Sequence, residues 1–253
     1  MEERPEAELI PLEGDSFRFE CHKGLRCWTR CCRALNLHLT PYDILRLKKR
    51  LGMKSGEFLD RFTDIKMEFP NPFPRVILKM KDEKERRCPF VTDAGCSVYE
   101  DRPSACRIYP LARASTKVQG EDRVRERYYI VKESHCLGLD ESQREWKVAE
   151  WVKNEGLLYY FKMNDHWMEI VTDYKNLKHV EGLKEKMRIF YIASYDMDRF
   201  RELVFDKRFL RRFQIEESVL KDMDSDEDAF LNFSTDWLLY IFYGRRSSLF
   251  KTS

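Results

Sequence analysis

Every cysteine of this chain lies within its first 136 residues, and this uneven placement limits the fold more than any other feature of the sequence. The chain has 253 residues, eight of them cysteine. These are Cys21, Cys27, Cys31, Cys32, Cys88, Cys96, Cys106 and Cys136. Four of the five tryptophans follow the last cysteine: Trp146, Trp151, Trp167 and Trp237. We therefore predict an N-terminal tail over residues 1–16, a cysteine-cluster domain over residues 17–138 and an aromatic-rich helical region over residues 139–253.

The cysteine-bearing half is predicted to contain short helices and little sheet. Thr40-Pro41 supplies an N-cap and a first-turn proline, and Gly52 supplies a C-cap, so we expect a helix between them. A second short helix is expected from Ser55 to Phe62. The prolines between residues 70 and 74 break the chain before a predicted strand over residues 75–81.

The two halves are predicted to differ in secondary structure. A small β-hairpin is expected over residues 118–131, turning at Gly120-Glu121-Asp122, with its second arm over residues 124–131. Beyond Asp140 the apolar residues recur every three or four positions, from Trp146 to Tyr243, which is typical of amphipathic helices. The expected fold class is α+β: a cysteine-rich metal-binding half with short helices and a small hairpin, followed by a mainly α-helical half.

The composition excludes several classes of protein. With 43% hydrophobic and 13% aromatic residues the chain can bury a core, which argues against disorder. Its formal charge of +2, from 46 basic and 44 acidic residues, gives no net field that would attract nucleic acid or anionic lipid. The acidic N-terminus lacks the apolar stretch of a signal peptide, and no apolar run of 18 residues occurs. We therefore expect a cytoplasmic protein with no membrane and no nucleic-acid partner.

Eight thiols admit three interpretations. A disulfide framework is typical of small secreted domains, whereas this chain is long and is expected in a reducing compartment. Inert buried thiols are common in protein cores, but core packing does not require cysteines to cluster along the chain. Metal binding explains the clustering directly, because about four thiolates must converge on one ion or cluster and short loops supply them at low entropic cost. We therefore favour metal binding.

The spacing of the cysteines fits one or two metal centres. Cys21, Cys27, Cys31 and Cys32 supply four sulfurs within twelve residues, and four more come from Cys88, Cys96, Cys106 and Cys136. All eight are candidate metal ligands, arranged as one four-sulfur site with spare thiols or as two such sites. Adjacent Cys31 and Cys32 fit one ion poorly, so either they serve different centres or only one of them binds metal. The predicted cofactor is an iron–sulfur cluster, of the 4Fe-4S type, or Zn²⁺, with iron–sulfur favoured slightly.

The residues around the cysteines favour thiolates over thiols. Nearby cations lower the pKa of a thiol, and nine basic residues flank the cluster: Lys23, Arg26, Arg30, Arg33, Arg86, Arg87, Arg102, Arg107 and Arg113. Pro103 is predicted to begin a short helix that holds Cys106 in its first turns, where the helix dipole favours negative charge. A solvated basic face would show the same arginines, so this support is indirect.

Three segments together resemble the YkgJ-type cysteine-cluster proteins, also known as the CxxCxxCC domain, whose description refers to zinc or iron chelation. They are Cys27-Trp-Thr-Arg-Cys-Cys-Arg33, Cys88-Pro-Phe-Val91 and Cys96-Ser-Val-Tyr-Glu-Asp-Arg-Pro-Ser-Ala-Cys-Arg-Ile-Tyr-Pro110. The similarity covers residues 17–137, and its most specific part is the Cys-x-x-Tyr-x-x-Arg-Pro-x-x-Cys-Arg block. The first three cysteines are five and three residues apart here, whereas the pattern in the family's name has two-residue gaps.

The resemblance implies a metal or iron–sulfur centre, with no reaction demonstrated for most of the family. One similar branch comprises flagellin lysine N-methylases, which use S-adenosylmethionine, so a protein lysine N-methylase is the alternative function. The sequence offers no glycine-rich turn after a strand and no Cys-x3-Cys-x2-Cys motif to support methyl transfer. Whether the chain is an enzyme stays open, as does a protein partner bound through the helical half.

The remaining candidates for chemistry are weaker. His22 and His135 each adjoin a cysteine and could replace a thiolate, whereas His38 fits a structural role. Asp165-His166 could form a base with its orienting carboxylate, although a helix-surface pair is the commoner explanation. Motifs of hydrolases and nucleotide triphosphatases do not occur. Basic and aromatic residues alternate over 123–129 and 205–213, and a hairpin arm and an amphipathic helix explain them without nucleic acid.

Overall fold

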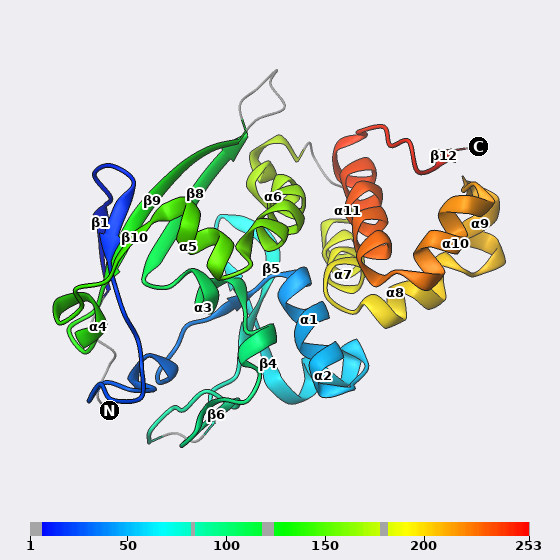
Figure 1. The fold of residues 1–253 in the computed structure, drawn as a ribbon. Coiled ribbons are helices and arrows are strands. Elements are labelled where there is room, and N and C mark those ends of the chain that lie inside the picture. Colours follow the sequence, from blue (N-terminus) through cyan, green and yellow to red (C-terminus); the bar gives the residue numbers. More distant parts are fainter. Residues whose placement is uncertain (1–6, 82–83, 118–123, 178–181, 253) are drawn as a thin grey trace. The chain divides into compact units, whose positions relative to one another are not determined.

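The computed structural model describes residues 7–81, 84–117, 124–177 and 182–252. It has the predicted α+β fold, with small antiparallel sheets and with helices concentrated in the C-terminal half (Figure 1). The chain forms two compact units, each built from two stretches. Unit 1 comprises Met1–Leu37 and Leu78–Phe161, and unit 2 comprises His38–Ile77 and Lys162–Ser253. All eight cysteines belong to unit 1, and the boundary near residue 138 stays a prediction.

Unit 1 consists of short strands and helices joined by loops. Its elements are β1 (Glu8–Pro11), β2 (Ser16–Arg18), the 3₁₀ turn η1 (Arg30–Cys32), β6 (Val91–Thr92), β7 (Gly95–Cys96), η2 (Tyr99–Asp101), α3 (Ser104–Ile108), β8 (Leu111–Lys117), β9 (Val124–Lys132), α4 (Leu137–Asp140), β10 (Glu145–Lys147), α5 (Val148–Asn154) and the start of α6 (Leu157–Thr172). The strands pair in the orders β1-β9-β8, β10-β2 and β6-β7. Strand β1 lies within the stretch that the sequence suggested to be a tail.

The predicted hairpin is present, but its first arm lies earlier in the chain than expected. Strand β9 begins at Val124 as predicted and pairs antiparallel with β8, which runs from Leu111 to Lys117. The predicted turn at Gly120-Glu121-Asp122 lies outside the described residues. The first arm begins at Leu111 because the chain leaves α3 at Ile108 and meets β9 at once. The amide of Val131 on β9 donates to the carbonyl of Pro110 at 2.7 Å.

Aromatic side chains form the core of unit 1 and hold helix α5 against Phe19 and the end of α3. The ring of Trp151 on α5 lies 5.6 Å from that of Phe19, in an edge-to-face arrangement. Its indole N–H donates to the carbonyl of Ile108 at the end of α3, at 3.1 Å. Trp146, which the apolar periodicity assigned to a helix, lies instead on β10 opposite Phe17. Backbone pairing with β2 overrides the helical pattern at that residue.

Unit 2 is built from helices and one small sheet. Its elements are β3 (His38–Leu39), α1 (Pro41–Leu51), α2 (Ser55–Phe62), β4 (Thr63–Glu68), β5 (Asn71–Leu78), the remainder of α6, η3 (Tyr174–Asn176), α7 (Leu183–Ser194), α8 (Met197–Val204), α9 (Lys207–Arg212), β11 (Phe213–Gln214), α10 (Glu217–Ser225), α11 (Glu227–Tyr243) and β12 (Lys251–Thr252). The strands pair in the orders β3-β5-β4 and β11-β12. The bounds of α1 and α2 agree with the prediction.

The ends of α1 show why the sequence predicts this helix well. The Thr40 side chain accepts from the amide of Asp43 at 3.2 Å, and the Asp43 carboxylate accepts from the amide of Thr40 at 2.9 Å. This reciprocal capping box satisfies two amides that have no partner within the helix. Gly52 ends the helix in the left-handed region, with φ of 65°.

The predicted strand over residues 75–81 is shifted toward the N-terminus. Strand β5 spans Asn71–Leu78 and therefore includes Pro72 and Pro74, which the sequence assigned to a chain break. Prolines remove one ladder hydrogen bond each and are tolerated where a strand has a free edge. Strand β3 pairs with β5 only at Ile77 and Val76 among the described residues, beyond both prolines.

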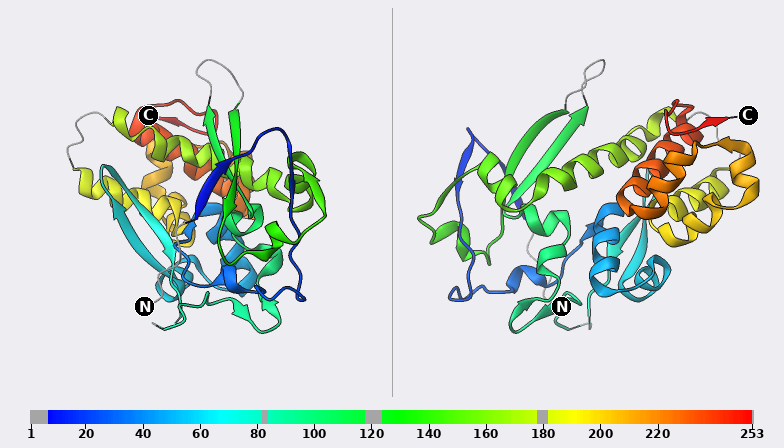
Figure 2. Two further views of the ribbon diagram at one scale, coloured as in Figure 1. Left: turned by 90° about the vertical axis from the view of Figure 1, so that its left-hand side faces the viewer. Right: turned by 45° about the vertical axis from the view of Figure 1, so that its right-hand side comes forward.

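The predicted helical half is confirmed, and its helices share an aromatic core. Helix α11 packs against α7 and α10 within unit 2 (Figure 2). Phe190 and Phe200 are almost fully buried there, and the ring of Phe190 lies 4.6 Å from that of Phe73. The indole N–H of Trp167 donates to the Ser194 hydroxyl at 3.1 Å, which satisfies a buried donor. Among the described helices none is long and apolar enough to cross a bilayer.

Candidate metal centre

The eight cysteines are thiols in this structure, and they fall into two groups of four. None of the eight, all of which lie in described residues, forms a disulfide. The Sγ atoms of the neighbours Cys31 and Cys32 are 3.9 Å apart, about twice the length of a disulfide bond. We call Cys21, Cys27, Cys31 and Cys136 group A, and Cys32, Cys88, Cys96 and Cys106 group B.

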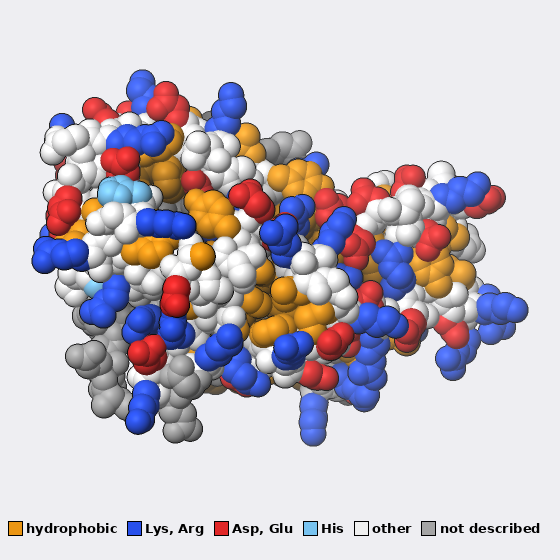
Figure 3. Space-filling view, turned by 60° about the horizontal axis from the view of Figure 1, so that its bottom comes forward, with side chains coloured by type: hydrophobic (Ala, Val, Ile, Leu, Met, Phe, Trp, Pro, Cys, Tyr) orange, Lys and Arg blue, Asp and Glu red, His pale blue; other side chains and the backbone are white. Residues whose placement is uncertain are grey.

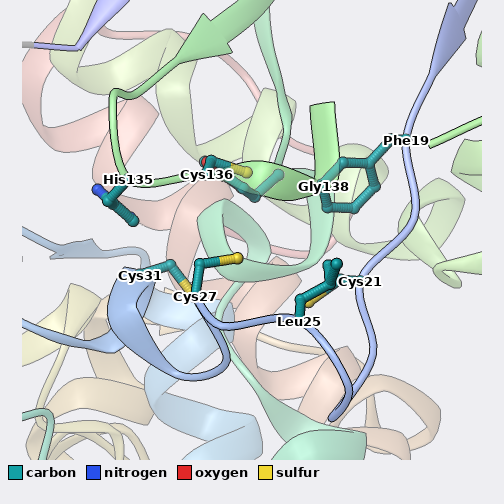
Figure 4. Close-up of a pocket in the computed structure, with 9 residues that line it drawn as sticks. Phe19, Cys21, Leu25, Cys27, Cys31, His135, Cys136 and Gly138 are labelled. Atoms are coloured by element: carbon teal, nitrogen blue, oxygen red, sulfur yellow. The ribbon is translucent and has the colours of Figure 1, made fainter. Parts of the chain in front are cut away.

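Group A lines a single pocket of unit 1 (Figure 4). Cys21, Cys27 and Cys31 lie on the N-terminal loop and face Cys136, which comes from the segment that follows β9. The other lining residues are Phe19, Leu25, Tyr109, His135 and Gly138. Four thiols from two distant segments therefore meet around one mainly apolar hollow.

Close backbone packing at Gly138 forms one side of this pocket. The amide of Glu20 donates to the carbonyl of Gly138 at 3.1 Å, so the N-terminal loop runs directly beside the start of α4. A Cβ atom at position 138 would lie 2.5 Å from the carbonyl oxygen of Glu20 and 3.0 Å from the Phe19 ring. Only glycine fits this approach, which brings Cys21 and Cys136 to the same pocket.

Group B is assembled by backbone contacts between three segments. The amide of Cys88 donates to the carbonyl of Cys32 at 2.8 Å, and an antiparallel bridge pairs Arg33 with Arg87. The hairpin β6-β7 then places Cys96 opposite Val91, close to Cys88. Cys88 and Cys106 each raise the pKa of Cys32, and Cys96 raises the pKa of Cys88, as neighbouring thiolates do.

The Arg-Pro block that follows Cys96 holds Cys106 in place. The Arg102 guanidinium stacks 3.8 Å above the Tyr99 ring and pairs with the buried carboxylate of Glu155. Arg107 donates to the carbonyl of Glu155 at 2.7 Å and to that of Arg102 at 3.2 Å. These bonds fix the short helix α3 from both ends, as planar guanidinium groups with several donors can do.

Burial raises the pKa of several thiols. Burial, with Cys31, Cys27 and Cys136 adding to it, raises the pKa of Cys21 to about 12; the residue is exposed as a whole, but its side chain lines the pocket. Burial likewise raises the pKa of Cys88 to about 11. The pKa of Cys32 is raised first by its hydrogen bond with Cys31 and then by burial. In the absence of metal these thiols are therefore protonated at neutral pH.

Backbone amides act against burial at three of the cysteines. The Sγ atom of Cys88 accepts from the amides of Phe90 and Val91, and that of Cys96 accepts from the amide of Val98. The Sγ atom of Cys136 interacts in the same way with the amides of residues 138 and 139. Each of these interactions lowers the thiol pKa, because an N–H donor favours the negatively charged sulfur. The loops are thus shaped to stabilise thiolates.

We predicted that the flanking basic residues lower the pKa of the thiols, and one of them does so in the structure. Arg102 lowers the pKa of Cys96, although burial of this thiol outweighs it. Most of the others have structural partners instead: Arg107 binds backbone carbonyls, and Arg113 pairs with Glu126 at 2.6 Å. Lys81 lowers the pKa of Cys88 and was missed, because it lies seven residues away along the sequence.

The histidines and the acidic residues add little to the candidate centre. His135 lines the group A pocket, 3.5 Å from Glu133, whereas His22 accepts from the amide of Gly24 on the surface. His166 pairs with Asp236 at 2.9 Å, and not with the neighbouring Asp165. Among the described residues, no three His, Cys, Asp or Glu side chains are already close enough to hold one ion. Coordination would require the thiols to rotate inward.

The comparison with known families agrees with this donor set. Residues 20–137 match the model of the CxxCxxCC family, which is described as a "Putative zinc- or iron-chelating domain". The match covers slightly less than half of the chain and includes all eight cysteines. No curated protein and no solved structure matches the chain. The family that residues 20–137 match is therefore the one that the cysteine-bearing segments resemble.

Proposed function

We propose that unit 1 binds metal at two four-thiolate centres, one formed by group A and one by group B. The observation that carries the proposal is the convergence of Cys21, Cys27, Cys31 and Cys136 on one pocket. The close packing at Gly138 brings together thiols from two loops about 110 residues apart, and a four-thiolate site requires such an arrangement. The composition of the donor set, all sulfur, suits zinc or iron and does not suit magnesium or calcium.

The N–H···S interactions give independent support. Amides aimed at Cys88, Cys96 and Cys136 cannot stabilise a neutral thiol as well as a thiolate. Burial nevertheless outweighs the amides and raises the pKa of each of these thiols, so the amides stabilise the sulfur most once a cation has displaced its proton. Raised thiol pKa values together with amides directed at the sulfurs are what we expect of a metal site before the metal binds.

We further propose that the bound group is an iron–sulfur cluster of the 4Fe-4S type. Wide gaps separate Cys88, Cys96 and Cys106, whereas structural zinc sites usually take two ligands from one Cys-x2-4-Cys knuckle. Such a cluster supplies one-electron transfer when bound. The residues of unit 1 contribute the thiolates, the surrounding amides and an apolar wall formed by Phe19 and Leu25.

Anaerobic purification followed by metal and acid-labile sulfide analysis tests both statements. Iron with an equal amount of sulfide, and broad visible absorption, would support the clusters. Colourless protein with two zinc ions per chain would support the two centres but contradict the proposal that they hold iron. Protein that takes up neither metal would overturn the centres themselves.

The other expectations stay predictions. Nothing in the described residues favours the lysine N-methylase alternative over metal binding alone. A cytoplasmic location and a protein partner on the helical region rest on the sequence. Positive and negative side chains are interspersed over the face shown in Figure 3. Our expectation of no nucleic-acid partner stays a prediction.

A further inference from the structure

We propose that the two centres load cooperatively, because the segments that form one also form the other. This inference rests on the proposed function and concerns how occupancy of the group A centre affects the group B centre. Three connections within unit 1 carry it: the Cys31–Cys32 peptide, the contact of Trp28 with Gly95, and the end of helix α3.

The first connection is the pair of adjacent cysteines in η1. Cys31 belongs to group A and Cys32 to group B, yet their Sγ atoms are only 3.9 Å apart. Thr29, which precedes η1, has φ of 63°, a conformation that side-chain-bearing residues rarely adopt. A cation on the Cys31 sulfur fixes this turn, and thereby fixes the position from which Cys32 reaches the other centre.

The second connection joins the N-terminal loop to the β6-β7 hairpin. Trp28 directly follows the group A ligand Cys27, and its ring lies over Gly95, which directly precedes the group B ligand Cys96. A Cβ atom at Gly95 would lie 3.1 Å from Cζ2 of that ring, so the two segments are in close contact. Ordering the loop around group A therefore positions the hairpin that carries Cys96.

The third connection runs through α3. This helix carries Cys106 of group B, and Tyr109 at its C-terminal end lines the group A pocket. The hydrogen bonds of Arg107 to two backbone carbonyls make α3 a stiff link between the two positions.

Shared segments lead to cooperativity for a thermodynamic reason. Ordering a loop costs conformational entropy. When the first ion binds, it orders the segments that both centres share, and this entropy loss weakens its binding. The second ion binds to segments already in place, so its affinity is higher. Coupling of this kind changes affinity by about fivefold or more, and it acts equally in both directions.

The test is an anaerobic titration of the metal-free full-length protein with Zn²⁺, followed by native mass spectrometry. With one Zn²⁺ added per chain, two independent and equal centres leave about half of the molecules singly loaded. We expect a clearly smaller singly loaded population, with empty and doubly loaded molecules in excess. A singly loaded population of half or more would overturn the proposal.

Two variants distinguish this proposal from the one it rests on. Trp28→Leu keeps all eight thiols and removes the ring over Gly95, and should raise the singly loaded fraction while still binding two ions. Cys21→Ser removes one group A thiol and should weaken zinc binding at group B as well. Unchanged group B affinity in Cys21→Ser would contradict the coupling. Saturation of the unaltered protein below two ions would instead contradict the two centres.

Discussion

The backbone amide of Cys88 donates a 2.8 Å hydrogen bond to the carbonyl oxygen of Cys32, although the two residues are far apart in the sequence. This bond fixes the second cysteine-bearing segment against the first. Cys32 does not line the pocket that the three cysteines before it share with Cys136. The predictions below follow from contacts of this kind.

Replacing Gly138 by alanine should disrupt the group A centre. The new Cβ atom would lie 2.5 Å from the Glu20 carbonyl oxygen, so the N-terminal loop and α4 must separate. We expect Gly138→Ala to lower the free energy of unfolding by about 1–3 kcal/mol, the usual cost of overpacking. Chemical denaturation gives the stability, and zinc titration should show weaker binding.

A matched control for this substitution is Gly56→Ala in helix α2. The nearest atom to a Cβ there is a carboxylate oxygen of Asp196 at 3.7 Å, an ordinary contact. Alanine also favours helices over glycine, so stability should stay the same or rise by about 1 kcal/mol or less. Equal losses in both variants would show that the close approach at Gly138 has no special role.

Removal of the Arg102 side chain should destabilise unit 1 and loosen the segment that carries Cys106. The change leaves the Glu155 carboxylate buried without its cationic partner, which typically costs about 3–5 kcal/mol. Thermal unfolding of Arg102→Ala would measure this loss. Adding Glu155→Gln should restore part of the stability, because the uncompensated charge is then gone.

The exposed pair of Arg188 and Glu185 serves as the control for that experiment. These side chains are both about two-thirds exposed and 3.9 Å apart, so Arg188→Ala should change stability by about 0.5 kcal/mol or less. If Arg102→Ala had an equally small effect, the pairing of Arg102 with buried Glu155 would not stabilise unit 1 as we propose.

Metal binding should become tighter as pH rises. The pKa values of Cys21 and Cys88 are about 12 and about 11, so both thiols bear protons at neutral pH in the metal-free protein. Each proton that the metal displaces makes the apparent affinity rise about tenfold per pH unit. Zinc titrations between pH 6 and 8 would measure this slope, and a flat profile would show that protonated thiols are not the ligands.

Metal-free protein should become less stable in alkaline solution. The pKa values of these thiols in the folded state lie above the ordinary thiol value of 9.0, so the unfolded chain loses its protons first as pH rises. Stability should therefore decrease above pH of about 9. Denaturation with and without bound metal should show this decrease only in the metal-free form.

The buried lysine of unit 2 offers a test that is separate from metal binding. Lys48 on α1 pairs with Glu227 at 2.6 Å and with Asp198 at 3.2 Å, and so joins α1 to α11 and α8. Lys48→Met should lower the free energy of unfolding by about 1–3 kcal/mol, since it leaves two partly buried carboxylates without their cation. Metal stoichiometry should not change, and a loss of metal would contradict the assignment of both centres to unit 1.

The sequence predicted those features that depend on neighbouring residues. Capping signals at Thr40 and Gly52 gave the bounds of α1, and the three-to-four-residue periodicity gave the C-terminal helices. The cysteine pattern indicated the family, which the match over residues 20–137 confirms. The helix beginning after Pro103 was also foreseen, with Cys106 inside it.

Features that depend on contacts between distant residues could not be predicted. Counting along the chain does not show that Cys136 lines one pocket with Cys21, Cys27 and Cys31. Nothing near Gly138 in the sequence shows that the Glu20 carbonyl will lie against it. Trp146 was assigned to a helix because periodicity alone does not reveal its pairing with β2.

The most direct test is X-ray absorption at the metal edge of anaerobically purified protein, combined with a count of metal per chain. Two separate centres should give a shell of sulfur neighbours at about 2.3 Å around the metal, with hardly any oxygen or nitrogen. Substituting Cys136 by serine should empty or alter one centre, and substituting Cys106 should do the same to the other. A single metal ion with oxygen-rich coordination, insensitive to both substitutions, would contradict the account.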